Sequence, residues 1–127
     1  MRVAIASDRA PKAIGPYSSA LRAGQLLFIS GQVPADPATG ALVEGDIEVQ
    51  TRRVLENIKA LLMEARLTLD HIVRTTVFLA DMDDFAAMNA AYRSYFTEPF
   101  PARSTVQAAR LPRNARLEID AIASYDA

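Results

Sequence analysis

The sequence predicts a single two-layer α+β domain that spans residues 1–127. The chain has 127 residues, half of them hydrophobic, which is the size of one compact domain with its own core. Segments with the alternation of strands are interspersed with two segments that have the three-and-four spacing of helices. Two helices cannot cover both faces of a sheet, so one face is expected to stay bare unless another chain covers it. We therefore expect an oligomer that associates through its sheet.

Short strands and turns are expected before residue 46. Arg2–Ser7 alternates weakly, whereas two prolines and a glycine in 10–16 favour a loop. Residues 17–22 and 25–30 flank Ala23-Gly24 and are expected to form a hairpin. The segment 33–40 is dense in turn-forming residues.

The remaining chain predicts two helices and three strands. Residues 47–65 predict the first helix, with Asp46 placed to cap it. The β-branched run 71–80 predicts a central strand that is buried on both faces. A second helix opens at Asp83-Asp84 and is stopped by Pro99 and Pro101. The segments 102–109 and 117–124 are expected to form a hairpin of two further strands.

The composition excludes several classes of chemistry. The chain has no cysteine and one histidine, so a thiolate nucleophile, a disulfide, a zinc-thiolate site and a histidine-rich metal site are excluded. A net charge of -1 gives no overall attraction to nucleic acid or to an anionic membrane. No apolar stretch is long enough for a membrane span or for the core of a signal peptide, so a cytoplasmic protein is expected.

Three groups of charged residues could serve a function, but each also has a purely structural interpretation. Asp81, Asp83 and Asp84 are close carboxylates, but a calcium loop's glycine and distal glutamate are missing, so a helix start is expected. His71 stands alone and is expected to be a surface or core residue. Arginines in and beyond the last loop suggest either a phosphate-binding patch or a solvated turn; these are Arg52, Arg53, Arg110, Arg113 and Arg116.

The strands near the C-terminus hold the most informative polar residues. Alternation places Arg103 and Thr105 on one face of their strand. Glu118 and Asp120 share a face of the next strand, opposite its apolar residues. From these residues alone, a cross-strand ion pair between Arg103 and Glu118 remains open.

Motifs along nearly the whole chain, from about residue 7 to 123, resemble the reactive-intermediate deaminase family, RidA, also called YjgF. The N-terminal motifs are Pro11, Ala13-Ile-Gly-Pro-Tyr-Ser18, Ile29-Ser-Gly-Gln-Val-Pro34, Asp36-Pro37 and Thr39-Gly40. The middle motifs are Gln50, Leu55, Asn57, Ile58, Ile72-Val-Arg-Thr-Thr-Val-Phe-Leu79, Asp84-Phe85, Met88-Asn89, Tyr92 and Phe96. The closing motifs are Pro101-Ala-Arg-Ser104, Leu111-Pro112 and Leu117-Glu-Ile-Asp-Ala-Ile-Ala123.

The resemblance implies a chorismate-mutase-like fold, with a mixed β-sheet, two helices packed on one face, and sheets that form the core of a homotrimer. It implies active sites in the clefts between subunits. The implied reaction is the hydrolysis of 2-imino and 2-enamino acids, such as 2-iminobutanoate and 2-iminopropanoate, to 2-keto acids and ammonia. Such a reaction needs a held carboxylate and one placed water, so neither a metal nor another cofactor is expected.

The resemblance also implies a role for each matching residue. Arg103 grips the substrate carboxylate, a planar bidentate task that suits a guanidinium, and Glu118 positions the attacking water. The other implied site residues line the pocket: Tyr17, Ser30, Gly31 as a backbone donor, Asn89, Tyr92 and Thr105. Thr105 departs from the cysteine that many relatives carry, but it keeps the main-chain groups that would bind the imine. Arg66 departs from a common glycine at the end of the first helix, where a left-handed turn would cost about 1 kcal/mol.

Two other functions stay open. The first is an RNA-acting translation inhibitor or endoribonuclease, supported by the arginines of the last loop. The second is a noncatalytic trimer that binds small carboxylates or holds client proteins as a chaperone would. Neither the preferred side chain of the imine nor its physiological source follows from the sequence.

Overall fold

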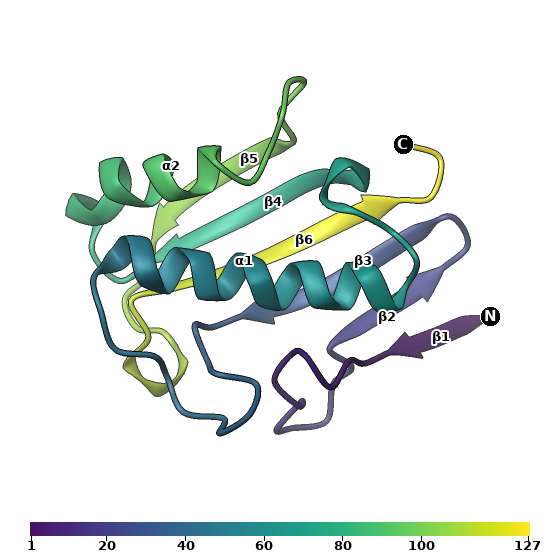
Figure 1. Ribbon diagram of the computed structural model, residues 1–127, viewed down its shortest axis with the longest axis horizontal. Coiled ribbons are helices and arrows are strands. Elements are labelled where there is room, and N and C mark those ends of the chain that lie inside the picture. Colours follow the sequence, from purple (N-terminus) through teal and green to yellow (C-terminus); the bar gives the residue numbers. More distant parts are fainter.

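The computed structural model describes residues 1–127 as a six-stranded sheet with two α-helices (Figure 1). The strands are β1 (Arg2–Ile5), β2 (Ala20–Ala23), β3 (Leu26–Gln32), β4 (Ile72–Leu79), β5 (Ala102–Gln107) and β6 (Leu117–Ser124). The helices are α1 (Ile47–Glu64) and α2 (Phe85–Arg93), with short 3-10 turns η1 (Leu69–His71), η2 (Met82–Asp84) and η3 (Pro112–Asn114). The strand order across the sheet is β1-β2-β3-β6-β4-β5. The predicted hairpin of β2 and β3 is confirmed, and it turns through Gly24 at a φ of 61°.

The predicted hairpin of the last two strands is wrong. β5 pairs in parallel with β4 after the α2 crossover, and β6 inserts between β3 and β4, antiparallel to both. The physical reason lies in how apolar the two strands are. β6 buries every second residue against the helices, whereas no residue of β5 is fully buried. The more apolar strand therefore takes the centre of the sheet, and β5 takes its edge.

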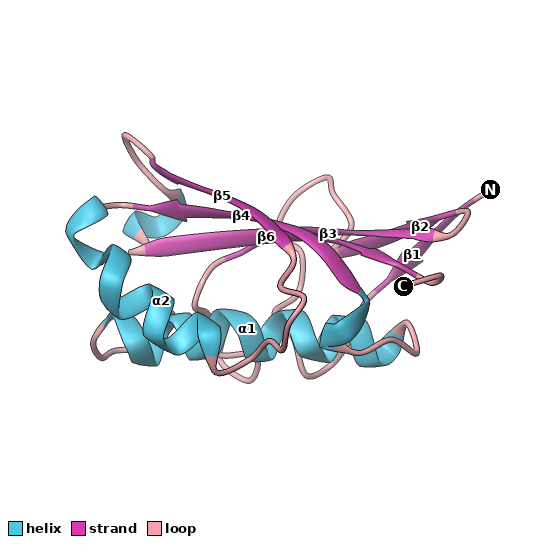
Figure 2. Ribbon diagram, turned by 90° about the horizontal axis from the view of Figure 1, so that it is seen from above, coloured by secondary structure: helices cyan, strands magenta, loops and turns pink.

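Both helices lie on one face of the sheet, as predicted, and the core fills the space between the two layers (Figure 2). The opposite face carries no layer, and large apolar side chains are exposed on it: Leu26, Phe28, Val73 and Val106, each between 39% and 44% exposed. The prediction that β4 is buried on both faces is therefore wrong for the single chain. β4 buries Thr75, Val77 and Leu79 toward the helices and leaves Val73 exposed.

The ends of α1 follow the prediction. Asp46 caps the helix, since its Oδ1 accepts a hydrogen bond from the backbone N–H of Val49 at 2.9 Å. Beyond its last residue, Arg66 adopts a left-handed conformation with a φ of 64°. The N–H of Leu67 then donates to the carbonyl oxygen of Leu62 at 2.8 Å, which closes the helix.

The second helix is shorter than predicted. It begins after the η2 turn and ends at Arg93, while Ser94 and Tyr95 form a turn that leads to Phe96. Phe96 stays buried because its ring packs on that of Tyr92 with centroids 4.6 Å apart. Core packing therefore continues past the helix end. No helix in the structure is long and apolar enough to cross a bilayer.

Candidate functional site

The residues expected at the site fall into two separate hollows. Tyr17, Ser30, Gly31 and Glu118 line a hollow of about 660 Å³, formed with the loops 11–19, 33–40 and 112–113. Asn89, Tyr92 and Arg103 line a second hollow of about 290 Å³ between α2 and β5. We call the first the Glu118 pocket and the second the Arg103 pocket.

Glu118 projects from β6 toward the face of the sheet that no helix covers. It pairs in register with Phe78 and alternates with Leu117 and Ile119, which are fully buried against the helices. Its carboxylate lies directly over Gly31, where any side chain would collide with it. Burial raises the pKa of Glu118, and the nearby charge of Asp120 raises it further. A raised pKa suits a carboxylate that must exchange protons near neutral pH.

Short hydrogen bonds hold the loops of the Glu118 pocket. Ser30 Oγ donates to the carbonyl oxygen of Ser18 at 2.7 Å, which fixes β3 against the segment that carries Tyr17. Asn57 on α1 is fully buried, and its Nδ2 donates to the carbonyl oxygen of Ala35 at 2.9 Å. The helix layer therefore anchors a wall of the pocket through one amide side chain.

Arg103 projects toward the opposite face, under α2. It pairs in register with Thr75, which is fully buried on the helix side of β4. The Arg103 guanidinium carbon lies 4.8 Å from the centre of the Tyr92 ring and 5.7 Å from that of Phe85. Both distances are in the range of cation–π contacts, which hold the cation without using its hydrogen-bond donors. No carboxylate pairs with Arg103, since the one ion pair of the chain joins Arg116 to Asp84 at 2.9 Å.

The surroundings of Arg103 are polar and partly unsatisfied. Tyr92 Oη and Thr75 Oγ1 share a buried hydrogen bond of 2.8 Å, which fixes the ring beneath the guanidinium. Burial raises the pKa of Tyr92, so its hydroxyl stays protonated at neutral pH. Asn89 Oδ1 and Thr105 Oγ1 are buried with no hydrogen-bond partner. Unpaired buried polar atoms are rare, and here both belong to residues near Arg103 in sequence or in its pocket.

Arg103 and Glu118 therefore lie on opposite faces of the same sheet, with β4 between their strands. The cross-strand ion pair that the sequence left open does not form, because β5 and β6 are not neighbours and the two side chains face opposite sides of the sheet. Within one chain, Arg103 and Glu118 therefore line separate pockets and cannot contact the same small molecule.

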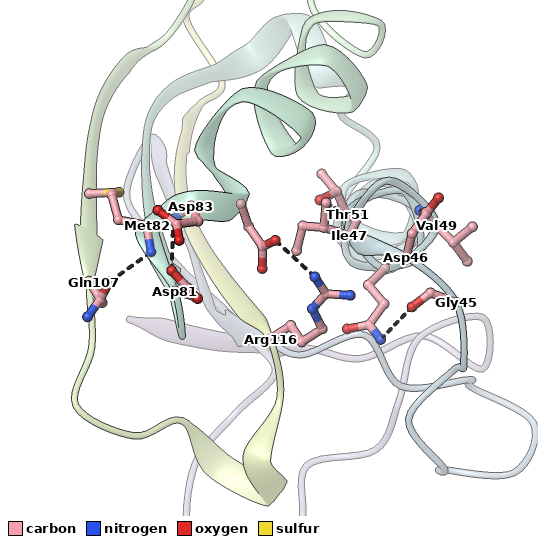
Figure 3. Close-up of polar contacts among 12 residues, drawn as sticks. Gly45, Asp46, Ile47, Val49, Thr51, Asp81, Met82, Asp83, Gln107 and Arg116 are labelled. Carbon is pink, nitrogen blue, oxygen red and sulfur yellow. Dashed lines mark hydrogen bonds and ion pairs between the residues drawn. The ribbon is translucent and has the colours of Figure 1, made fainter.

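The aspartate cluster serves the start of α2, as predicted (Figure 3). Asp81 Oδ1 accepts from the N–H of Asp83 at 2.9 Å, and Asp84 accepts from Arg116. Gln107 Oε1 at the end of β5 accepts from the N–H of Met82 at 2.7 Å. The lone histidine has a structural role as well, because His71 Nδ1 accepts from the N–H of Thr68 at 3.0 Å.

The five arginines proposed as a phosphate patch are dispersed. Arg116 is paired with Asp84, Arg52 donates to Ser94 Oγ at 3.3 Å, and Arg53 donates to Asn57 Oδ1 at 3.2 Å. Arg113 lines the Glu118 pocket, whereas Arg53 lines a different groove beside α1. No single basic surface unites them.

The sequence did not assign four residues to the two pockets, although Arg113 and Asp120 were noted in other roles. Phe85 contacts Arg103, Asp120 acts on Glu118, and Lys12 and Arg113 line the Glu118 pocket. The spacing of Phe85 and Tyr92, two turns apart on one helix, was the available signal for the aromatic support of Arg103. No local pattern placed Lys12 and Arg113 in one pocket, because they lie in loops that are far apart in the sequence.

The fold and the two pockets define a class of small α+β domain, in which two helices cover one face of a six-stranded sheet and the other face stays open. A family model described as Endoribonuclease L-PSP matches residues 7–125. The chain belongs to this family, which is the RidA/YjgF family that its motifs resemble.

Individual relatives agree with this assignment. A RutC family protein of Pyrococcus horikoshii is 54% identical over 97% of this chain and 98% of its own. A protein of Salmonella typhimurium named 2-iminobutanoate/2-iminopropanoate deaminase is 49% identical over 97% and 98%. The crystal structure of Escherichia coli TdcF with bound serine is 44% identical, covers 96% of this chain and 98% of TdcF, and superposes with a TM-score of 0.91. The predicted α+β fold of the family is confirmed.

Proposed function

We propose that this protein hydrolyses 2-imino and 2-enamino acids, among them 2-iminobutanoate and 2-iminopropanoate, to 2-keto acids and ammonia. The observation that carries the proposal is the Arg103 guanidinium, which is supported by two aromatic rings, lacks an ion-pair partner and borders a hollow. A guanidinium in this state offers parallel donors to a planar carboxylate. The proposed location is the cytoplasm, where pyridoxal-phosphate dehydratases release such imines.

The proposed catalyst is a homotrimer whose active sites lie between subunits. Arg103, Asn89, Tyr92 and the main chain at Thr105 come from one subunit. Tyr17, Ser30, Gly31 and Glu118 come from the next. The apolar side chains on the open face of the sheet support such an assembly, because burying them is favourable by about 25 cal/mol per Å².

The chemistry of the step is a hydrolysis that balances with one water. Arg103 holds the carboxylate, and the Glu118 carboxylate takes a proton from a water as its oxygen attacks C2 of the imine. The carbinolamine that forms then expels ammonia as protons move to nitrogen, leaving a carbonyl at C2. Main-chain donors such as Gly31 N–H stabilise the charge that develops during this sequence.

Two relatives support this reading. The Salmonella protein is named for the reaction proposed here, and TdcF binds serine, a small molecule with a carboxylate. In the present chain, Arg103 in one pocket would bind the carboxylate of such a molecule, and Glu118 in the other would activate water.

The direct test couples the purified protein to a threonine or serine dehydratase and follows the loss of the imine signal. Wild type should clear the intermediate faster than buffer, and Arg103→Ala should clear it no faster than buffer. Arg110→Ala is the matched control, because Arg110 is exposed and lines neither pocket. Equal clearance by wild type and Arg103→Ala contradicts the assignment.

A mixing experiment tests the shared site. Arg103→Ala and Glu118→Gln should each be inactive alone. When the two are unfolded together and refolded, mixed trimers contain clefts with an intact Arg103 from one subunit and an intact Glu118 from its neighbour. Recovery of activity supports the shared site, whereas none in mixtures shown to exchange subunits contradicts it.

The family description favours one alternative, the cleavage of RNA. Binding through phosphates must weaken steeply as salt rises. A labelled RNA incubated with the protein at low and moderate salt therefore separates the alternatives, since hydrolysis of 2-iminobutanoate, which has no second acidic group, depends on Arg103 and not on the loop arginines. A carboxylate-binding trimer without catalysis would bind 2-keto acids through Arg103 and show no turnover.

A further inference from the structure

The Glu118 pocket is larger than a four-carbon imino acid requires. Its volume of about 660 Å³ lies within the range of about 300–1,000 Å³ that suits ligands of drug size. Glu118, Ser30 and Gly31 form one part of its lining, and the loops 11–14 and 112–113 form another. A substrate whose C2 faces Glu118 therefore leaves room toward these loops.

Two cations stand in that part of the pocket. Lys12 and Arg113 both line it, both are exposed, and neither makes an ion pair within the chain. They do not neutralise Glu118 either, because the pKa of Glu118 is raised by burial and by Asp120, with no cation lowering it. The pocket thus holds two positive charges that form no ion pair with its own carboxylate.

The backbone fixes Arg113 at this position. Arg113 and Asn114 are both left-handed, with φ values of 59° and 57°, a conformation that disfavours an arginine. The N–H of Asn114 donates to the carbonyl oxygen of Leu111, and that of Ala115 to Pro112, each at 3.1 Å. Ala115 is buried and anchors the turn to the core. The turn therefore holds Arg113 in the lining of the pocket, in a backbone conformation that is strained for an arginine.

We propose that Lys12 and Arg113 form an anion subsite of the Glu118 pocket that admits 2-imino acids with a second acidic group. This inference rests on the proposed function, because Arg103 of the neighbouring subunit holds the first carboxylate. The substrates are then imines of dicarboxylic amino acids, which arise when an oxidase or dehydrogenase removes two electrons and two protons from the amine. The planar donors of Arg113 suit a distal carboxylate, and Lys12 adds a mobile charge.

Binding of a matched pair of 2-keto acids tests the subsite. The two probes are 2-ketoglutarate and 5-methyl-2-oxohexanoate, in which a neutral isopropyl group replaces the distal carboxylate. At low salt, calorimetry should show that wild type binds 2-ketoglutarate about three- to tenfold more tightly, the effect of one charge-assisted contact near solvent. The preference should shrink as salt rises.

Charge-removing variants locate the effect. Lys12→Gln with Arg113→Gln should abolish the preference and leave the neutral probe's affinity unchanged, and Arg113→Lys should retain part of it. Arg110→Gln, in the same loop but outside the pocket, should behave as wild type.

Equal affinity of wild type for both probes overturns the subsite, as does an equal loss in Arg110→Gln and Arg113→Gln. The proposed function fails separately, if Arg103→Ala binds the neutral probe as well as wild type does. Lys12, Arg110 and Arg113 are exposed, so their variants are expected to fold. Circular dichroism verifies this.

Discussion

The carboxylate of Glu118 lies against the α-carbon of Gly31 and occupies the space that a side chain at position 31 would need. A Cβ built on Gly31 overlaps Glu118 Oε2 and stands 2.7 Å from Cδ. The glycine is therefore required by close approach, since no positive φ occurs at this position. It sets where the proposed water-activating group stands relative to β3.

Gly31→Ala should lower kcat by about tenfold to a hundredfold, because a displacement of roughly 1 Å at a catalytic group is enough for such a loss. Folding should persist, since the methyl group meets the flexible end of a side chain. Gly24→Ala is the control. Gly24 has open space around it and a φ of 61°, so its substitution should reduce stability and leave kcat unchanged. Steady-state kinetics and thermal unfolding of both variants distinguish these outcomes.

Phe85→Leu should raise KM about threefold to tenfold and change kcat little. Its ring supports the Arg103 guanidinium at 5.7 Å, and a cation–π contact at a partly exposed site contributes roughly 0.5–1 kcal/mol or somewhat more. Phe85→Tyr keeps a ring in the same place and should restore the wild-type KM. An unchanged KM in Phe85→Leu would show that Tyr92 alone positions the guanidinium.

The pH profile of kcat/KM should have an acidic limb above 4.5, the ordinary pKa of a glutamate. Burial and the charge of Asp120 raise the pKa of Glu118, and the proposed reaction needs its ionised form. Asp120→Asn removes one of the two causes and should move the limb toward lower pH. An acidic limb at the same pH in Asp120→Asn as in wild type would show that another group controls the reaction.

Glu118 should also make the protein less stable as pH rises. A carboxyl with a raised pKa binds its proton more tightly in the folded than in the unfolded state, so stability is highest below 4.5 and falls through the raised pKa. Glu118→Gln cannot ionise and should therefore be more stable than wild type at neutral pH. Urea unfolding at several pH values should show this advantage vanish below 4.5.

Arg66→Gly should stabilise the fold by up to about 1 kcal/mol, because glycine adopts the left-handed conformation at the end of α1 without steric strain. A substitution to glycine in the middle of the helix should instead destabilise the fold. Lys59 is exposed in the middle of α1, and Lys59→Gly should cost about 1 kcal/mol. Urea unfolding of the two variants gives both signs in one experiment.

Local patterns in the sequence predicted the first helix well. The three-and-four spacing of 47–65 and the capping aspartate at 46 depend only on residues near each other in the chain, and α1 follows them closely. The left-handed turn at Arg66 followed from the family motif. The placement of β6 did not follow, because the adjacent segments 102–109 and 117–124 resemble a hairpin locally. Only competition for the buried centre of the sheet separates them.

By itself, the sequence determined the family, the α+β class, the caps of the first helix and the candidate residues Arg103 and Glu118. Each of these depends on residue type and on spacing along the chain. The tertiary structure decided that the two residues face opposite sides of one sheet and that Lys12 and Arg113 line the same pocket. Strand order and loop packing fix those relationships through contacts between distant segments, and no local periodicity encodes such contacts.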